Sequence, residues 1–258
     1  MNETKRFECI LDELHYLLID LQMIGVKITL VGGQVISLEA RALGGDGVIE
    51  VHTPTDIVIQ RGYSMEPDLL FDVEEAGARS DAILDVLRQR NFKRVRTHRW
   101  RKDLPLAGEM LIDLFVPPAA DEAYNPGGFT QLPAADLVLA RATPLKVVIP
   151  SGEFEIHIPD PAGFLAMKLE AKISLRPNET KDSFDIYAYV AMKGVDEIRT
   201  ALGIDTETRN RIIADLRYLF GDVSSPGVRD AVSYASTLNE DETALLERAA
   251  VDLFQQLW

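Results

Sequence analysis

Apolar residues recur at steps of three and four over residues 7–24. This spacing puts them on one face of a helix, and it predicts an amphipathic first helix. A short apolar run at residues 26–31 predicts a buried strand that ends at Gly32-Gly33. Residues 34–43 have the pattern of a short helix. The N-terminal part of the chain is therefore expected to form a helix, a strand and a second helix in succession.

Strand and helix patterns continue to about residue 160, after which helical periods dominate. The strands expected in this first part are at residues 55–60, 92–100, 110–116, 146–149 and 154–158, with a helix at residues 78–89. The helices expected in the last part are at residues 162–174, 181–192, 206–219 and 240–257. Strands followed by helices are typical of an α+β fold. We therefore predict a mixed sheet with flanking helices in residues 1–160 and a helical C-terminal region in residues 161–258.

The composition is that of a globular protein. Of 258 residues, 47% are hydrophobic and 26% are charged, which does not suit a disordered chain. The single cysteine, Cys9, excludes an internal disulfide, as expected for a reducing compartment. The polar N-terminus lacks the apolar core of a signal peptide, and no apolar run approaches the roughly 20 residues that a bilayer requires. We expect a cytoplasmic protein without a membrane partner.

Charge is distributed unevenly along the chain. The net charge of −14 argues against broad nucleic-acid binding. Residues 88–102 nevertheless contain eight Lys or Arg and no Asp or Glu. Composition leaves two interpretations of this stretch open. It is either a solvated helix end and strand edge, or the wall of a site for a polyanion such as a triphosphate or an RNA backbone.

Two aspartates interrupt apolar runs that are predicted to be strands. Asp113 lies within the apolar residues 110–116, and Asp56 is followed by Ile-Val-Ile. An ionised carboxylate inside an apolar strand costs several kcal/mol unless something pairs with it, and a divalent cation is one such partner. Water at a strand end or a structural arginine is another. Asp56 and Asp113 are thus candidate metal ligands.

The order of these features resembles the pattern of the nucleotidyltransferase superfamily. That pattern has a glycine pair that opens a helix, a strand with Asp-x-Asp, and a third Asp on a neighbouring strand. Gly32 and Gly33 match the glycine pair. Asp113 matches the third carboxylate, and Asp56 matches one member of Asp-x-Asp.

This resemblance implies a nucleotidyltransferase-fold sheet and a site for a nucleoside triphosphate (NTP). The glycines would let the backbone approach the triphosphate, and the helix N-terminus would favour its negative charge. Asp56 and Asp113 would hold Mg²⁺ together with the NTP. We expect these two carboxylates within roughly 6 Å of each other on adjacent strands, as a shared metal requires.

The helical region resembles one branch of the superfamily, the AbiEii/MenT-like toxins of type IV toxin–antitoxin systems. Residues 164–172 and 181–187 are similar to its Lys-Leu and Lys/Arg-Asp-x-x-Asp-Leu motifs, and the whole resemblance covers about residues 25–192. The site residues implied here are Lys168 and Asp185 for catalysis, and Lys172 and Asp182 for nucleotide binding. The branch also implies nucleotide transfer to an acceptor, with tRNA or another RNA as a candidate, and a cognate antitoxin as a partner.

Helix geometry gives a second view of these four residues. Lys168 and Lys172 lie about 40° apart around a helix, within an apolar arc. They either meet phosphate in a cleft or extend past the edge of the core. Asp182 and Asp185 either orient these lysines or interact favourably with the helix dipole in its first turn.

The carboxylate motif departs from the superfamily in two ways. The distance in sequence from Gly33 to Asp56 is long, and Val58 stands where relatives place a second carboxylate. Val58→Asp is therefore expected to raise the affinity for Mg²⁺. Three functions stay open: a nucleotidyltransferase acting on RNA or a small hydroxylated acceptor, a degenerate relative that binds a nucleotide or a partner without catalysis, and a nucleotidyltransferase of the antibiotic-modifying kind.

Overall fold

The residues with the predicted apolar spacing near the N-terminus lie in helix α1 (Glu3–Met23). The side chain of Asn2 caps this helix by accepting a hydrogen bond from the backbone N–H of Lys5. Its buried residues follow the predicted spacing: Phe7, Ile10, Leu11, Leu14, Leu17, Leu18 and Leu21. Strand β1 (Ile28–Val31) is buried throughout, and helix α2 (Gln34–Ala42) follows it. The helix, strand and helix predicted for this part of the chain are confirmed.

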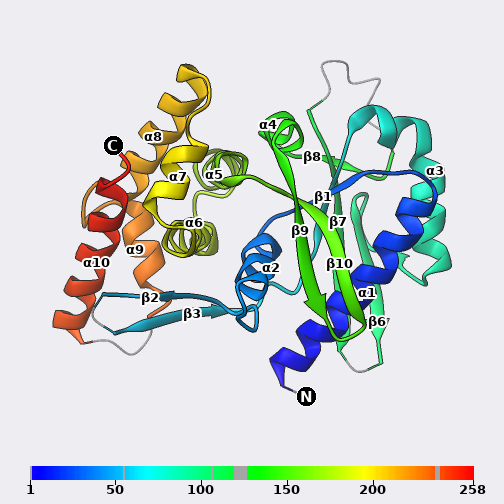
Figure 1. The fold of residues 1–258 in the computed structure, drawn as a ribbon, viewed down its shortest axis with the longest axis horizontal. Coiled ribbons are helices and arrows are strands. Elements are labelled where there is room, and N and C mark those ends of the chain that lie inside the picture. The colour runs from blue at the N-terminus through cyan, green and yellow to red at the C-terminus, as the bar shows by residue number, and fades with distance from the viewer. Residues whose placement is uncertain (1, 55, 106, 119–126, 236–238) are drawn as a thin grey trace. The chain divides into compact units, whose positions relative to one another are not determined.

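The computed structural model describes residues 2–54, 56–105, 107–118, 127–235 and 239–258. The chain divides into two compact units, and most of their elements are labelled in Figure 1. Unit 1 comprises Met1–Gly47 and Tyr63–Pro159, and unit 2 comprises Val48–Gly62 and Asp160–Trp258. The later division falls between Pro159 and Asp160. Residues 48–62, however, belong to unit 2 and not to the N-terminal part.

Unit 1 is built on a mixed sheet in the order β5-β6-β7-β4-β1-β10-β9, with β8 paired to β7. Its other strands are β4 (Asp68–Phe71), β5 (Lys93–Arg94), β6 (Arg99–Leu104), β7 (Gly108–Val116), β8 (Thr130–Gln131), β9 (Ala142–Ile149) and β10 (Gly152–Pro159). The pairs β1–β10, β4–β7 and β7–β8 are parallel, and the others are antiparallel. Helices α3 (Val73–Gln89) and α4 (Ala135–Ala140) complete the unit, and α1 lies against α3 and β9 (Figure 1).

The side chains of strand β7 alternate between the two faces of the sheet. Met110, Ile112 and Leu114 alternate along the strand and are fully buried. Because successive side chains on a strand point to opposite faces, Asp113 points away from them. The carboxylate is therefore displayed on the face opposite to this row of apolar side chains.

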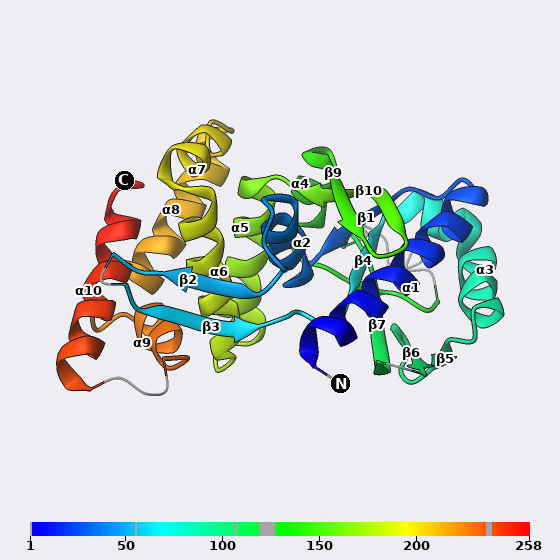
Figure 2. The ribbon, with the colours of Figure 1, turned by 60° about the horizontal axis from the view of Figure 1, so that its bottom comes forward.

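Unit 2 is helical apart from one hairpin. Its elements are β2 (Ile49–His52), β3 (Val58–Gly62), α5 (Pro161–Glu170), a π-helical segment (Ala171–Leu175), α6 (Thr180–Lys193), α7 (Val195–Ala201), α8 (Thr206–Phe220), α9 (Pro226–Val232) and α10 (Glu240–Gln255). Helix α6 contacts α5, α7, α9 and α10, and β2 packs on it (Figure 2). The α+β prediction is confirmed, with a mixed sheet and flanking helices in unit 1 and helices in unit 2. Among the described residues no helix is long and apolar enough to cross a membrane.

Several short elements differ from the prediction. Strands β2 and β4 and helices α4, α7 and α9 were not expected from the sequence, because each is at most seven residues long and shows little periodicity. The strand expected at residues 92–100 is two strands, β5 and β6, joined by a turn. The strand expected at residues 55–60 begins only at Val58, and Asp56 lies in the turn before it with a positive φ of 61°.

Candidate functional site

The two glycines after β1 lie where the backbone turns into α2. Gly32 has a φ of 77°, a conformation that glycine adopts without strain, and Gly33 is the N-cap residue of α2. A Cβ atom added to Gly32 would overlap Oδ2 of Asp68 and lie 3.1 Å from its Cγ. Glycine is therefore required at this position both by the backbone and by the carboxylate next to it.

Asp68 and Asp113 are direct neighbours in the sheet. The parallel pairing of β4 with β7 sets Asp68 opposite Asp113, so that both side chains lie on one face, with the strands about 4.8 Å apart. Asp113 is 8% exposed, and Asp68 is half-buried beside Gly32. The glycine turn and these two carboxylates form one cluster, which we call the carboxylate site.

Arg99 completes the carboxylate site from strand β6. Its register sets it opposite Asp113, and its Nε and Nη2 donate to Oδ1 and Oδ2 of Asp113 at 2.8 and 2.6 Å. Nη2 also lies 3.4 Å from Oε2 of Glu66. Hydrogen bonding to Asp113, together with the charges of Asp113, Glu66 and Asp68, outweighs partial burial and raises the pKa of Arg99. Arg99 therefore stays a cation between the acidic groups.

The prediction that Asp56 lies on a strand next to that of Asp113 is wrong. Asp56 is exposed in the turn between β2 and β3 of unit 2, and the neighbours of Asp113 across the sheet are Asp68 and Arg99. Val58 lies on the same hairpin and is 44% exposed. The Mg²⁺ gain expected for Val58→Asp therefore loses its structural basis.

The residues that sequence reasoning missed are Glu66 and Asp68. Glu66-Pro67-Asp68 has two carboxylates two positions apart, directly before the apolar run Leu69–Phe71. The spacing is that of the Asp-x-Asp motif described above, with Glu66 in the place of the first Asp. The two carboxylates are visible in the sequence, but strand β4 has only four residues and is too short to be predicted from its apolar pattern.

The basic stretch at residues 88–102 is largely neutralised within unit 1. Arg90 and Lys102 both pair with Glu13 of α1, at 2.9 and 2.6 Å, and Arg101 pairs with Glu109 of β7 at 3.3 Å. The cations exposed at the turn after β5 and within β5 itself are Lys93, Arg94 and Arg96. Most of the stretch therefore pairs with acidic side chains of the same unit.

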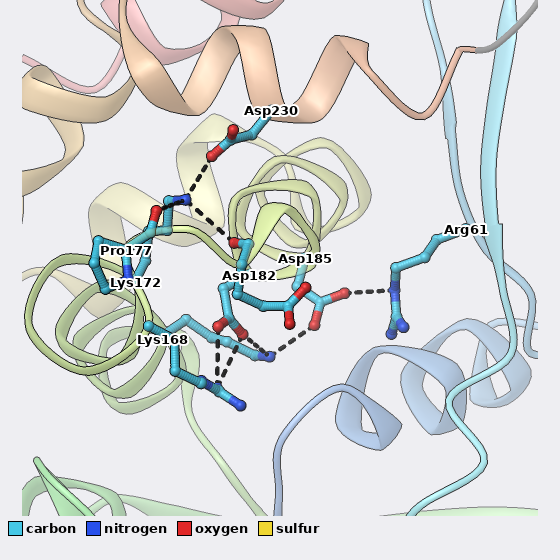
Figure 3. A network of polar contacts seen from close by, with 9 residues as sticks. Arg61, Lys168, Lys172, Pro177, Asp182, Asp185 and Asp230 are labelled. Carbon is cyan, nitrogen blue, oxygen red and sulfur yellow. Dashed lines mark hydrogen bonds and ion pairs between the residues drawn. The ribbon is translucent and has the colours of Figure 1, made fainter.

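The predicted residues of the helical region form a buried ion-pair network in unit 2 (Figure 3). Lys168 is 4% exposed, and its Nζ lies 3.0 Å from Oδ1 of Asp182 and 2.7 Å from Oδ2 of Asp185. Arg61 of β3 reaches the other oxygen of Asp185 at 2.8 Å, and Arg176 reaches Oδ2 of Asp182 at 3.0 Å. Both carboxylates are thus shared between two cations.

Burial and charge act in opposite directions on Lys168. Burial would lower the pKa of its ammonium group, but the facing carboxylates of Asp185 and Asp182 outweigh it, and the pKa is raised. Lys168 is therefore charged at neutral pH, as its two partners require.

Lys172 is engaged separately from Lys168. Its Nζ lies 2.6 Å from Oδ2 of Asp230 and donates to the carbonyl oxygens of Pro177 and Glu179 at 2.6 and 3.2 Å (Figure 3). These contacts tie the segment between the π helix and α6 to α9. Of the interpretations left open for Asp185, the contacts show an ion pair with Lys168. The ammonium groups of Lys168 and Lys172 are both held by protein oxygens.

We expect Gly32→Ala to destabilise unit 1 by about 2–4 kcal/mol, since it combines a positive φ with overlap onto Asp68. The matched control is Gly108→Ala, where φ is 72° and nothing lies within 4 Å of the added methyl group. It should cost only about 1 kcal/mol. Urea unfolding of both variants measures the difference. Equal losses would contradict the close contact between Gly32 and Asp68.

No protein-family model matches the chain, and no curated protein sequence matches it. The chain is similar to solved structures of ANT(2″)-Ia, described as an antibiotic-resistance factor. Its solution structure is 13% identical, with a TM-score of 0.46 over 83% of this chain and 96% of that one. The crystal structure of ANT(2″)-Ia in complex with adenylyl-2″-tobramycin is 12% identical, with a TM-score of 0.43 over 78% of this chain and 95% of that one.

Proposed function

We propose that the protein is a nucleotidyltransferase that binds the triphosphate of an NTP at the carboxylate site and transfers the nucleotidyl group to a hydroxylated acceptor. The observation that carries this proposal is the register of Asp68 with Asp113, directly beside Gly32. It joins a glycine turn, a helix N-terminus and two carboxylates on one face of a sheet, which are parts of the superfamily pattern described above.

Each part of the site has a role in this proposal. Gly32 and Gly33 let the backbone approach phosphate, and the N-terminus of α2 favours its charge. Among the described residues no three His, Cys, Asp or Glu side chains converge as a ready metal site. Two carboxylates nevertheless fit Mg²⁺, which proteins usually hold with one or two carboxylates together with substrate phosphates. Asp68 and Asp113 would hold it.

When bound, Mg²⁺ would neutralise phosphate charge and orient the reacting oxygens. The chain itself supplies the anion-binding turn and the fixed carboxylates. Because the strand register sets Asp68 and Asp113 side by side before any ligand arrives, little reorganisation of the backbone is needed.

The direct test is incubation with each of the four α-³²P-labelled NTPs, Mg²⁺, and either total RNA or a panel of small aminoglycosides and other polyols. The proposal expects label on one acceptor class with one or more NTPs, lost when EDTA is added. No transfer to any acceptor, together with no NTP binding, would contradict it.

A second function is favoured by Arg99. Its two hydrogen bonds occupy both oxygens of Asp113, which suits a relative that binds nucleotide without catalysis. NTP binding without transfer to any acceptor would support this alternative.

The finer assignments rest on the sequence resemblance. We propose RNA, including tRNA, as the acceptor class, with a small hydroxylated molecule as the competing one; the exposed cations Lys93 and Arg96 support RNA. A type IV toxin role, with a cognate antitoxin, depends on the motifs around Lys168 and Asp185 alone. It predicts growth arrest on expression of the wild-type chain, and unaffected growth would contradict it.

A further inference from the structure

The ion pair between Arg99 and Asp113 has a well-defined geometry. It is bidentate, joins two residues in register on adjacent strands, and leaves Asp113 only 8% exposed. Both oxygens that a metal ion would use on this residue are therefore engaged. Planar two-point pairing of this kind is among the strongest that a carboxylate makes.

Arg99 also interacts with the other acidic groups of the site. Its Nη2 is 3.4 Å from Oε2 of Glu66, and the negative charges of Asp113, Glu66 and Asp68 all stabilise its cationic form. The guanidinium thus contacts both Asp113 and Glu66 and is attracted by the charge of Asp68, so a divalent cation at Asp113 would have to replace a resident positive charge. Its side chain is 30% exposed, so part of it is already in contact with solvent.

We propose that Arg99 is an internal counter-ion that competes with a divalent cation for Asp113, so that metal and triphosphate bind together only when the guanidinium leaves that carboxylate. The inference rests on the proposed function for its triphosphate, but the competition for Asp113 is a property of the free protein. Once released, the guanidinium is suited to bind phosphate oxygens, because its fork of donors matches them as it matches a carboxylate.

Two consequences follow for metal binding. Without nucleotide, the affinity for Mg²⁺ is weak, since the metal must displace a resident cation. With nucleotide, the affinity rises, because the triphosphate offers the displaced guanidinium a new partner as well as ligands for the metal.

Calorimetric titration with MgCl₂ and MnCl₂ in the absence of nucleotide tests the competition directly. Arg99→Gln should bind either metal about tenfold more tightly than the wild type, or better. The matched control is Arg101→Gln, on the same strand, whose partner Glu109 lies outside the site; its metal affinity should be unchanged. The gain should vanish in the double variant Arg99→Gln/Asp113→Asn.

Thermal unfolding is a second measurement, and it still tests the proposal if Arg99→Gln is less stable than the wild type. Arg99→Gln leaves the Asp113 carboxylate without its partner, so its Tm should fall in EDTA and rise again with Mg²⁺ by more than that of the wild type. Arg99→Lys keeps a positive charge but cannot make the two-point hydrogen bond. The rise of its Tm with Mg²⁺ should lie between those of the wild type and Arg99→Gln. Equal metal affinity in wild type and Arg99→Gln, or a gain that persists without Asp113, would overturn the proposal.

These outcomes separate the inference from the proposed function. If no variant transfers nucleotide but Arg99→Gln gains metal affinity through Asp113, the counter-ion role stands and the enzymatic proposal fails. If transfer occurs but the metal affinity is the same with and without Arg99, the enzymatic proposal stands and the counter-ion role fails.

Discussion

Asp68→Asn and Asp113→Asn should each reduce nucleotidyl transfer by about a thousandfold or more, while the fold is kept. Each substitution removes one anionic ligand from a site that offers two adjacent carboxylates, and metal stabilisation of phosphate charge contributes several kcal/mol. The measurement is the initial rate of transfer of label from an α-³²P-labelled NTP to the acceptor identified with the wild type.

Two aspartates serve as controls for this prediction. Asp103→Asn changes an exposed residue of β6 outside the site, and Asp56→Asn changes the exposed residue in the β2–β3 turn. Both variants should transfer at close to the wild-type rate. A large loss with Asp56→Asn and none with Asp68→Asn would restore the original sequence-based assignment.

Lys168→Met should destabilise the protein by about 3–5 kcal/mol, the usual cost of removing one partner of a buried ion pair. The substitution keeps the length of the side chain but leaves Asp182 and Asp185, both at most 1% exposed, without their shared cation. Lys193→Met is the matched control, because Lys193 pairs with the half-exposed Glu197 on the helix surface. It should cost less than about 1 kcal/mol.

The pH dependence of this effect follows from the raised pKa of Lys168. A lysine whose pKa is raised on folding stabilises fully below its ordinary value of 10.5 and loses that contribution as the pH rises through the folded value. The difference between wild type and Lys168→Met should therefore be constant near neutral pH and shrink only in strong alkali. Urea unfolding from pH 6 to 11 measures it.

The same variant decides between the structural and phosphate-binding interpretations of Lys168. The contacts favour a large loss of stability with unchanged NTP affinity, measured on protein that is still folded at low temperature. A small change in Tm with lost NTP affinity would show that Lys168 reaches the nucleotide, as the family resemblance implies.

Local patterns were sufficient for the elements that are long and periodic. The face of α1 was predicted because its apolar spacing continues over residues 7–24, and β7 was predicted because residues 110–116 are apolar apart from Asp113. Asp113 could be identified for the same reason, since a single carboxylate in such a run is conspicuous.

The partners of Asp113 could not be predicted, because they depend on strand pairing between distant residues. Nothing local in Asp68–Phe71 specifies that this short strand pairs in register with β7, and nothing in the basic stretch marks Arg99 as the residue opposite Asp113. Residues 48–62, which belong to unit 2, separate Gly33 from Asp68 in the sequence, so Asp56 is the first aspartate before an apolar run after the glycine pair.

The helical region shows the same limit. Spacing correctly placed Lys168 and Lys172 on a buried arc, but it did not show what neutralises them. Asp230 lies nearly sixty residues after Lys172, and Arg61 lies more than one hundred residues before Asp185. Only the fold brings these charges together.

We propose that Asp68 and Asp113 form a metal-dependent triphosphate site. Calorimetric titration with the α,β-methylene analogues of the four NTPs, which cannot be cleaved at the reacting bond, tests it most directly. With Mg²⁺ at least one analogue should bind, its affinity should fall about tenfold or more in EDTA, and Asp68→Asn/Asp113→Asn should abolish the metal dependence. Equal affinity with and without Mg²⁺, unchanged by the double substitution, would contradict the account.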